Sequence, residues 1–148
     1  MSTKEAQQYI DNYFARYSKI KVFLDQLTQN ATTTGYALTL FNRRRTILEL
    51  SSNNFSIREY GKRIAMNMPI QGTAADIIKI AMINVHNALK NTKSKLILTV
   101  HDELLLEVHK SEIEKVSTIL KHEMENAVHL SVPLLVEVKQ GNNWYSTK

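Results

Sequence analysis

Two adjacent carboxylates, Asp102 and Glu103, lie between two apolar runs rich in β-forming residues. Residues 96–100 precede His101, and residues 104–108 follow Glu103. Two such runs separated by a short polar stretch predict a β-hairpin with the polar residues at its tip. Carboxylate oxygens held on a stiff element are suitable ligands for a hard cation such as Mg2+. On spacing alone an ordinary polar turn also explains these residues, because Asp and His accept unusual backbone angles.

A second polar set recurs every four residues in a segment that we expect to be helical. Its members are Arg63, Asn67 and Gln71, called the groove row below. A continuous helix would place all three on one face. Each can donate hydrogen bonds, and the minor groove of a duplex offers acceptors at every base pair. The row could therefore contact DNA without reading its sequence, but taken alone the spacing favours a solvated polar face with nothing bound. Pro69 interrupts the row, and we expect a kink or break there.

Three consecutive arginines form a third candidate. Arg43, Arg44 and Arg45, called the arginine turn below, follow Asn42 between two short predicted strands. Guanidinium groups at a turn suit phosphate, and such contacts position a protein on a duplex. The chain carries 19 Lys and Arg against 14 Asp and Glu, for a formal net charge of +5. This excess permits a polyanionic partner, but short basic turns also serve solubility alone.

The first third of the chain predicts two helices. Apolar residues recur at helical intervals over residues 6–17 and again over 20–27. Ser2 and Glu5 have the spacing of a capping box, and Gly35 suits a helix end. The Tyr and Phe side chains of the first helix fall on its apolar stripe, so we expect them in the core rather than stacked on bases.

The middle of the chain predicts short strands followed by helices. The strands are expected over residues 36–41 and 46–48, and the helices over 55–68 and 74–89. Thr73 and Asp76 have capping-box spacing, which would restart the second helix after Pro69.

Beyond the predicted hairpin, Ser111 and Glu114 have the spacing of a further capping box, before a helix that continues to Ala127. Residues 134–138 follow Pro133 and predict a final strand. Helices mixed with antiparallel strands define the α+β class. We expect helices packed on a small antiparallel sheet that has the hairpin at its centre.

Composition narrows the classes of protein further. The chain has 148 residues, enough for a hydrophobic core, and no apolar run approaches the roughly 18 residues that a membrane helix needs. We therefore expect no membrane partner. The absence of cysteine excludes disulfides and thiolate metal sites and favours a reducing cytoplasm.

Three blocks carry a family resemblance. Residues 63–76 closely resemble a signature of family A DNA polymerases of the bacterial DNA polymerase I type, and residues 98–107 resemble the family's third polymerase motif. Residues 35–45 are similar to a further stretch of the family. The blocks occur in the family's order and at about its spacing. The chain is thus identified as a C-terminal fragment, with distal fingers helices and the basic turn over 1–55 and a palm portion over 56–148.

The resemblance implies nucleotidyl transfer. A primer 3′ hydroxyl would attack the α-phosphate of a deoxynucleoside triphosphate, with two Mg2+ ions as cofactors. Asp102 would be a ligand of these ions, Glu103 an accessory carboxylate beside them, and His101 a neighbour of the primer terminus. The groove row would contact the minor groove and template near the nascent pair. The arginine turn, Arg45 especially, would hold the template strand.

The same resemblance implies an incomplete site. The family's first metal-binding aspartate and its nucleotide-binding fingers helix have no counterpart here, so we expect the chain alone not to extend primers. The expected partners are primer–template DNA, deoxynucleoside triphosphates and the missing N-terminal part of the same polymerase, in bacterial cytoplasm at the nucleoid. Missing palm strands would leave an exposed sheet edge and a tendency to self-associate. Asn42 replaces the family's usual glycine, and Asn tolerates a left-handed turn.

Two other functions stay open. One is a non-catalytic DNA-binding module that keeps the groove row. The other is a small carboxylate–metal hydrolase with the hairpin as its site, which is disfavoured because no second carboxylate cluster has ligand spacing.

Overall fold

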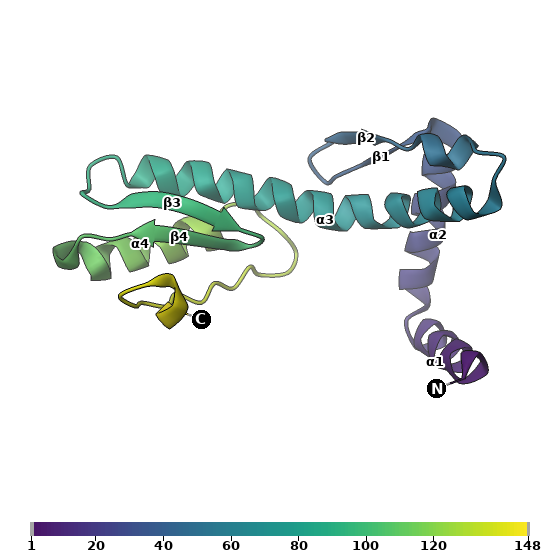
Figure 1. Ribbon diagram of the computed structural model, residues 1–148, viewed down its shortest axis with the longest axis horizontal. Coiled ribbons are helices and arrows are strands. Elements are labelled where there is room, and N and C mark those ends of the chain that lie inside the picture. The colour runs from purple at the N-terminus through teal and green to yellow at the C-terminus, as the bar shows by residue number, and fades with distance from the viewer. Residues whose placement is uncertain (1, 148) are drawn as a thin grey trace. The chain divides into compact units, whose positions relative to one another are not determined.

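The computed structural model describes residues 2–147 and mixes helices with two-stranded antiparallel sheets (Figure 1). The helices are α1 (Thr3–Arg16), α2 (Ser18–Thr34), α3 (Phe55–Ala88) and α4 (Ile113–Glu125). Strands β1 (Tyr36–Leu38) and β2 (Arg44–Thr46) pair in one sheet, and β3 (Lys95–Val100) and β4 (Glu103–Glu107) in the other. Short 3-10 helices cover Leu48–Ser51, Lys110–Glu112 and Trp144–Thr147. The α+β class is confirmed.

The chain forms two compact units, one ending at Thr73 and the other beginning at Ala74, and α3 contributes residues to both. The predicted ends of the first two helices are confirmed in the first unit. The Ser2 hydroxyl accepts a hydrogen bond from the Glu5 amide, and the Glu5 carboxylate accepts one from the Ser2 amide. Gly35 ends α2 with φ 78°, in the left-handed region that glycine adopts without steric strain. The division at residues 55 and 56 stays a prediction.

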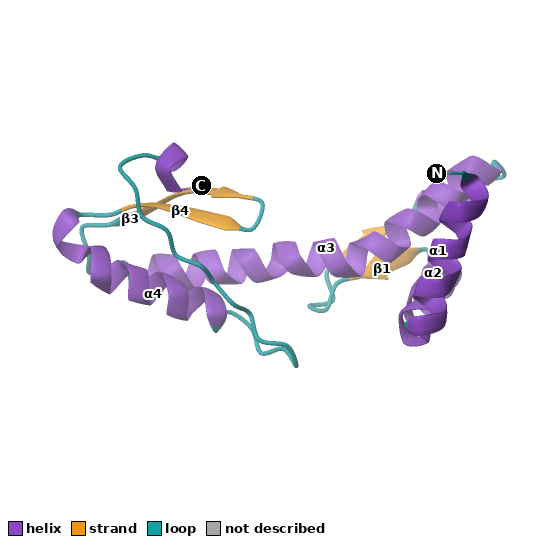
Figure 2. Cartoon of the chain, turned by 90° about the horizontal axis from the view of Figure 1, so that it is seen from below, coloured by secondary structure: helices purple, strands orange, loops and turns teal. Residues whose placement is uncertain are grey.

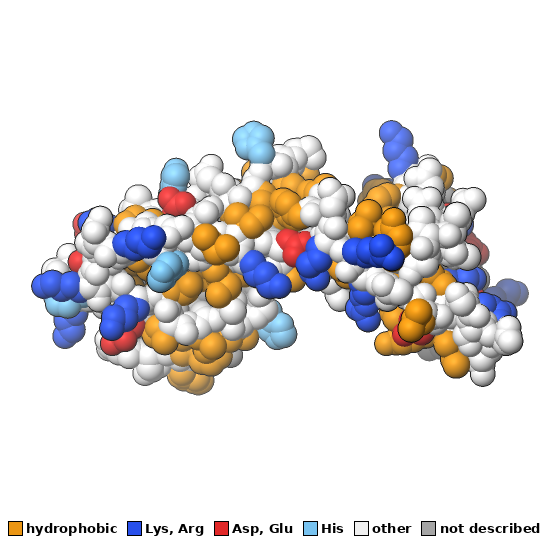
Figure 3. Space-filling view, turned by 90° about the horizontal axis from the view of Figure 1, so that it is seen from above, with side chains coloured by type: hydrophobic (Ala, Val, Ile, Leu, Met, Phe, Trp, Pro, Cys, Tyr) orange, Lys and Arg blue, Asp and Glu red, His pale blue; other side chains and the backbone are white. Residues whose placement is uncertain are grey.

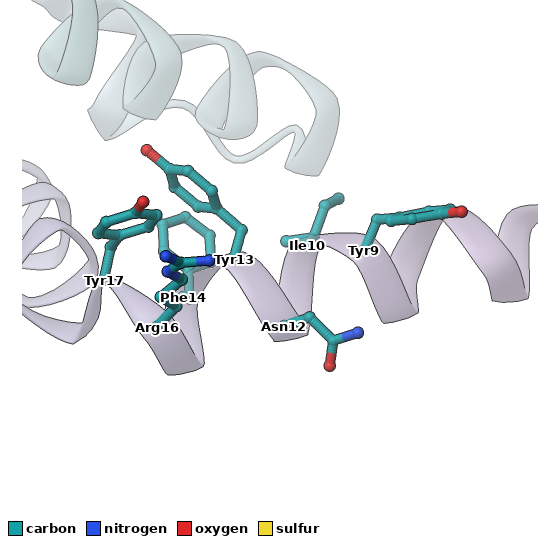
Figure 4. Close-up of a pocket in the computed structure, with 7 residues that line it drawn as sticks. All are labelled: Tyr9, Ile10, Asn12, Tyr13, Phe14, Arg16 and Tyr17. Atoms are coloured by element: carbon teal, nitrogen blue, oxygen red, sulfur yellow. The ribbon is translucent and has the colours of Figure 1, made fainter.

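The aromatic stripe of α1 is not buried, contrary to our expectation. No residue of α1 is buried, and Tyr9, Tyr13 and Tyr17 are 70%, 48% and 45% exposed. The Tyr13 ring instead contacts the rings of Phe14 and Tyr17, and all three side chains line a pocket on the surface of α1 and its C-cap (Figure 4). The core of the unit lies elsewhere, in the set Ala31, Ala37, Ile47, Leu50, Ile64, Ala65 and Met68. The helical spacing of apolar residues thus identified the apolar face of α1, but it did not show whether another part of the chain packs against that face.

Helix α3 runs through Pro69 without a break, which corrects the expected interruption. Proline removes one helical hydrogen bond at a cost of about 3 kcal/mol. Burial on both sides offsets this cost, since Ala65 is fully buried before it and Ala81 is 2% exposed after it. Thr73 therefore caps no helix. Its hydroxyl donates to the Pro69 carbonyl and accepts from the Leu40 amide.

In the second unit, the C-terminal half of α3 and the whole of α4 lie on the same side of the β3–β4 hairpin (Figure 2). Side chains alternate across a strand, so Leu104 and Leu106 pack against Val85 and Val116 of the two helices. By the same alternation, Glu103 points to the face that the helices leave open. One face of the hairpin thus anchors it, and the other can bear polar groups.

The start of α4 differs from the predicted capping box, because Ser111 lies in a 3-10 turn and Glu112 occupies the N-cap position. The Glu112 carboxylate accepts hydrogen bonds from the Ser94 hydroxyl at 2.7 Å and from the Lys93 amide at 3.0 Å. Ser94 is buried and also accepts from the His109 amide at 3.1 Å. These bonds tie the base of the hairpin to the beginning of α4.

The Glu112 tie predicts an acid-sensitive fold. The hydrogen bond from Ser94 lowers the pKa of the Glu112 carboxyl below its ordinary value of 4.5. A depressed pKa in the folded state stabilises the fold above 4.5, and this stabilisation is lost as the pH falls through the folded value. We expect the thermal midpoint of Glu112→Gln to depend less on pH below 4.5 than that of the unmodified chain. Glu114→Gln, on the exposed part of α4, is the control and should keep the full dependence.

The predicted final strand over residues 134–138 is wrong, because this segment is not a strand in the structure. The Val136 amide donates to the Glu125 carboxylate, and no described segment offers it a β-ladder. Alternating apolar and polar residues predict one buried face, but a β-strand also needs a partner strand to accept and donate its backbone hydrogen bonds. None of the described helices combines the length and the apolar character required to cross a membrane.

Candidate metal and nucleic-acid site

The predicted hairpin is confirmed, and its tip is a two-residue turn. Val100 pairs with Glu103, which leaves His101 and Asp102 between the strands. His101 has φ 53°, in the left-handed region. Positive φ at the first turn residue is typical of a type II′ turn, whose twist matches that of the paired strands. The turn is therefore narrow, and its backbone is closely specified.

The two tip carboxylates are available to a ligand. Asp102 and Glu103 are exposed, and neither side chain makes a hydrogen bond or an ion pair with another described residue. Residues 2–147 contain no group of three or more His, Cys, Asp or Glu that could hold a metal ion. Mg2+ takes six oxygen ligands and keeps several waters. The donor set therefore fits part of a magnesium site, with two carboxylates from this chain and the other ligands from elsewhere.

The groove row lies on one uninterrupted face. Arg63, Asn67 and Gln71 are all exposed on α3, and a rise of about 6 Å separates each from the next. The Arg63 guanidinium lies 5.7 Å from the centre of the Tyr60 ring. The side chains of Asn67 and Gln71 have no hydrogen-bond partner among the described residues. The row spans about 12 Å, the length of three to four base-pair steps.

The arginine turn divides into three different environments. Arg43 donates from Nη2 to the Gly72 carbonyl at 2.8 Å, and the Arg44 guanidinium stacks 4.0 Å above the Tyr36 ring. The Arg45 side chain is exposed and makes no hydrogen bond or ion pair with another of residues 2–147. The turn itself is displaced from the prediction, because Arg44 and Arg45 already belong to β2. Asn42 has φ 61°, which confirms its left-handed conformation.

Positive charge is concentrated in the unit that carries these residues. The unit up to Thr73 has ten Lys and Arg against five Asp and Glu, and it holds all the arginines. The other unit has nine of each, so its formal charge is zero. Figure 3 shows basic side chains interspersed with apolar ones on the face it draws. The net charge of +5 thus belongs to the unit of the groove row and the arginine turn.

The sequence did not indicate the roles of Gly72 and Thr73, which accept hydrogen bonds from Arg43 and Leu40 in the turn between β1 and β2. Gly72 itself was the one sequence signal for this contact. A glycine within a helical segment often marks a close approach of another part of the chain.

Comparison with known proteins assigns the family. The family model of DNA polymerase family A matches residues 1–146, and the chain belongs to this family. It is 56% identical over 150 residues to DNA polymerase I of Caldicellulosiruptor bescii, a match that covers 100% of this chain and 18% of that protein. It is 44% identical over 145 residues to the thermostable DNA polymerase I of Thermus filiformis, covering 98% of this chain and 17% of that protein. The chain thus spans less than a fifth of the length of these curated relatives.

A solved structure is also similar. It is described as the POL domain of Pol1 from M. smegmatis in complex with DNA primer-template and dNTP. The two chains superpose with a TM-score of 0.95 at 42% sequence identity, covering 99% of this chain and 26% of that one.

Proposed function

We propose that this chain is the part of a DNA-directed DNA polymerase, active in DNA replication and repair, that provides the palm hairpin and the distal fingers. The carrying observation is the exposed Asp102–Glu103 pair at the tip of a two-residue turn. A similar polymerase domain has been solved with primer-template DNA and dNTP, which supports the same partners for this chain.

In this proposal the tip residues act at the primer terminus. Asp102 would hold the catalytic Mg2+, with Glu103 as an accessory carboxylate on the open face of the hairpin and His101 next to the primer end. When bound, the metal would supply activation of the primer 3′ hydroxyl and stabilisation of charge on the leaving oxygen. The two-residue turn fixes the backbone from which both carboxylates project, so that part of the site is ordered before substrate binds.

The first unit binds the duplex. The groove row donates hydrogen bonds to acceptors that every base pair presents in the minor groove, so it checks pair geometry without reading sequence. Arg45 contacts a template phosphate, and Arg44 adds a second positive charge while stacked on Tyr36. The positive charge of this unit supports such a contact.

The chain by itself does not extend primers in this proposal. Two carboxylates are the whole acidic contribution of the described tip, and a two-ion site needs more ligands. The remainder of the polymerase is thus a required partner, in the cytoplasm at the nucleoid. The alternative is a non-catalytic DNA-binding module, which the exposed groove row favours on its own.

Duplex binding tests the proposal. We expect the chain to bind a primer–template duplex with an affinity that falls linearly with the logarithm of salt concentration, as followed by fluorescence anisotropy. Arg45→Ala should reduce the salt slope by about 1, because one phosphate contact is lost. Arg16→Ala removes an exposed arginine of the same unit and should leave the slope unchanged. Equal effects of the two substitutions would contradict a defined contact at Arg45.

Self-association is a further part of the proposal. Each described sheet has only two strands, so β3 and β4 each leave one edge unpaired among the described residues. Open edges template pairing with another chain. We expect the mass from light scattering to rise with protein concentration, and a constant monomer mass at high concentration would contradict the idea.

A further inference from the structure

We infer that Arg43 and Thr73 are positioning residues that clamp the turn between β1 and β2 onto α3, so that Arg45 and the groove row meet a duplex as one preformed surface. The inference rests on the proposed function, because it assumes that Arg45 and the groove row bind DNA. It assigns Arg43 a different role from its two neighbours.

Two hydrogen bonds join the turn to the helix. The Leu40 amide donates to the Thr73 hydroxyl at 2.9 Å, and the Arg43 guanidinium donates to the Gly72 carbonyl at 2.8 Å. These bonds connect positions 33 and 29 residues apart in the chain. Both partners on α3 follow Gln71 directly. The clamp therefore holds the helical turn that carries the last member of the groove row.

Close packing seats the turn at the same point. Thr39 is 4% exposed, and its hydroxyl accepts from the Arg43 amide at 3.1 Å. Gly72 is buried, and a Cβ added to it would lie 2.6 Å from Cγ2 of Thr39. Such a distance is far inside van der Waals contact, so only glycine allows this approach. The turn and α3 are in direct contact rather than joined by long side chains alone.

Thr73 also connects the turn to the part of α3 that contains Pro69. The Thr73 hydroxyl donates to the Pro69 carbonyl while it accepts from Leu40. One side chain thus links the helical segment at Pro69 to the turn that leads to Arg45.

Preorganisation is the functional consequence. An unclamped turn would have to be ordered at the moment of binding, and ordering a loop or a long side chain reduces affinity. A turn already fixed against α3 avoids that loss. The contribution of the clamp to duplex affinity should therefore depend on Arg45, the phosphate contact that the clamp positions.

A double-mutant cycle on the full 148-residue chain tests this coupling. Thr73→Val has nearly the same shape without the hydroxyl, and Thr73→Ser keeps the hydroxyl as the matched control. We expect Thr73→Val to weaken binding of a primer–template duplex about fivefold, and less than about twofold when Arg45 is already alanine. Thr73→Ser should bind like the unmodified chain. Amide exchange at Leu40 should be faster in Thr73→Val than in Thr73→Ser.

A second variant covers a failure of Thr73→Val to fold. Arg43→Lys keeps the charge but loses the planar guanidinium fork, and its effect should show the same dependence on Arg45. Equal losses in both Arg45 backgrounds would overturn the inference, because general destabilisation acts in either background. If the chain binds the duplex but the effects of these substitutions do not depend on Arg45, the inference about the clamp is overturned and the proposed function is not. No binding by the unmodified chain overturns the proposed function and the inference with it.

Discussion

Asp102→Asn is expected to abolish primer extension when the chain is combined with the part of Caldicellulosiruptor bescii DNA polymerase I that lies outside the matched region. The substitution keeps the shape of the side chain and removes its negative charge. In the proposed role of a metal ligand, Asp102 lowers the barrier by several kcal/mol, and losing about 4 kcal/mol of this stabilisation corresponds to a reaction about a thousandfold slower. Product length on a denaturing gel, with Mg2+ and all four triphosphates, measures the change.

Two controls separate the site from the fold. Glu114→Gln removes an exposed carboxylate from α4 and should retain the rate of the unmodified combination. The unmodified chain alone should give no extension. Robust incorporation by the chain alone that Asp102→Asn abolishes would contradict the incomplete site. A combination that binds duplex but never extends it would favour the DNA-binding module.

Local signals in the sequence identified the features that depend on few residues. The capping box at Ser2, the helix end at Gly35 and the left-handed Asn42 are each decided by the chemistry of one or two side chains. The hairpin was also predictable, because its strands are adjacent in the chain and its tip is polar. The exposure of Asp102 follows from that placement.

Several of the incorrect predictions concern contacts between distant segments. Pro69 was expected to end a helix, but tertiary burial on both sides of it keeps α3 continuous. Ser111 has the spacing of an N-cap, yet the carboxylate of Glu112 is drawn to Ser94, 18 residues earlier in the chain. The individual roles of the three arginines were equally unpredictable, because they depend on Tyr36 and Gly72 lying beside them. The spacing of residues along the sequence does not show which residues the fold brings beside them.

Gly72→Ala should destabilise the chain, although the same change usually stabilises a helix. In an open helical position alanine is favoured over glycine by about 1 kcal/mol. Here the new methyl group would lie 2.6 Å from Cγ2 of Thr39 and 3.1 Å from the end of Met68. Overpacking of this kind costs about 1–3 kcal/mol, which exceeds the gain in propensity. We expect a lower free energy of unfolding, measured by urea denaturation.

The rescue makes this prediction specific to the contact. Thr39→Ser removes only Cγ2 and keeps the hydroxyl that accepts from the Arg43 amide. Combined with Gly72→Ala, it removes the clash and leaves the helical preference for alanine, so the double variant should recover most of the lost stability. Thr39→Ser alone is the control and should cost little. The two changes are in contact and should be strongly non-additive. If Gly72→Ala instead stabilised the chain, the turn between β1 and β2 would not rest on α3, and the preformed duplex-binding surface would have no structural basis.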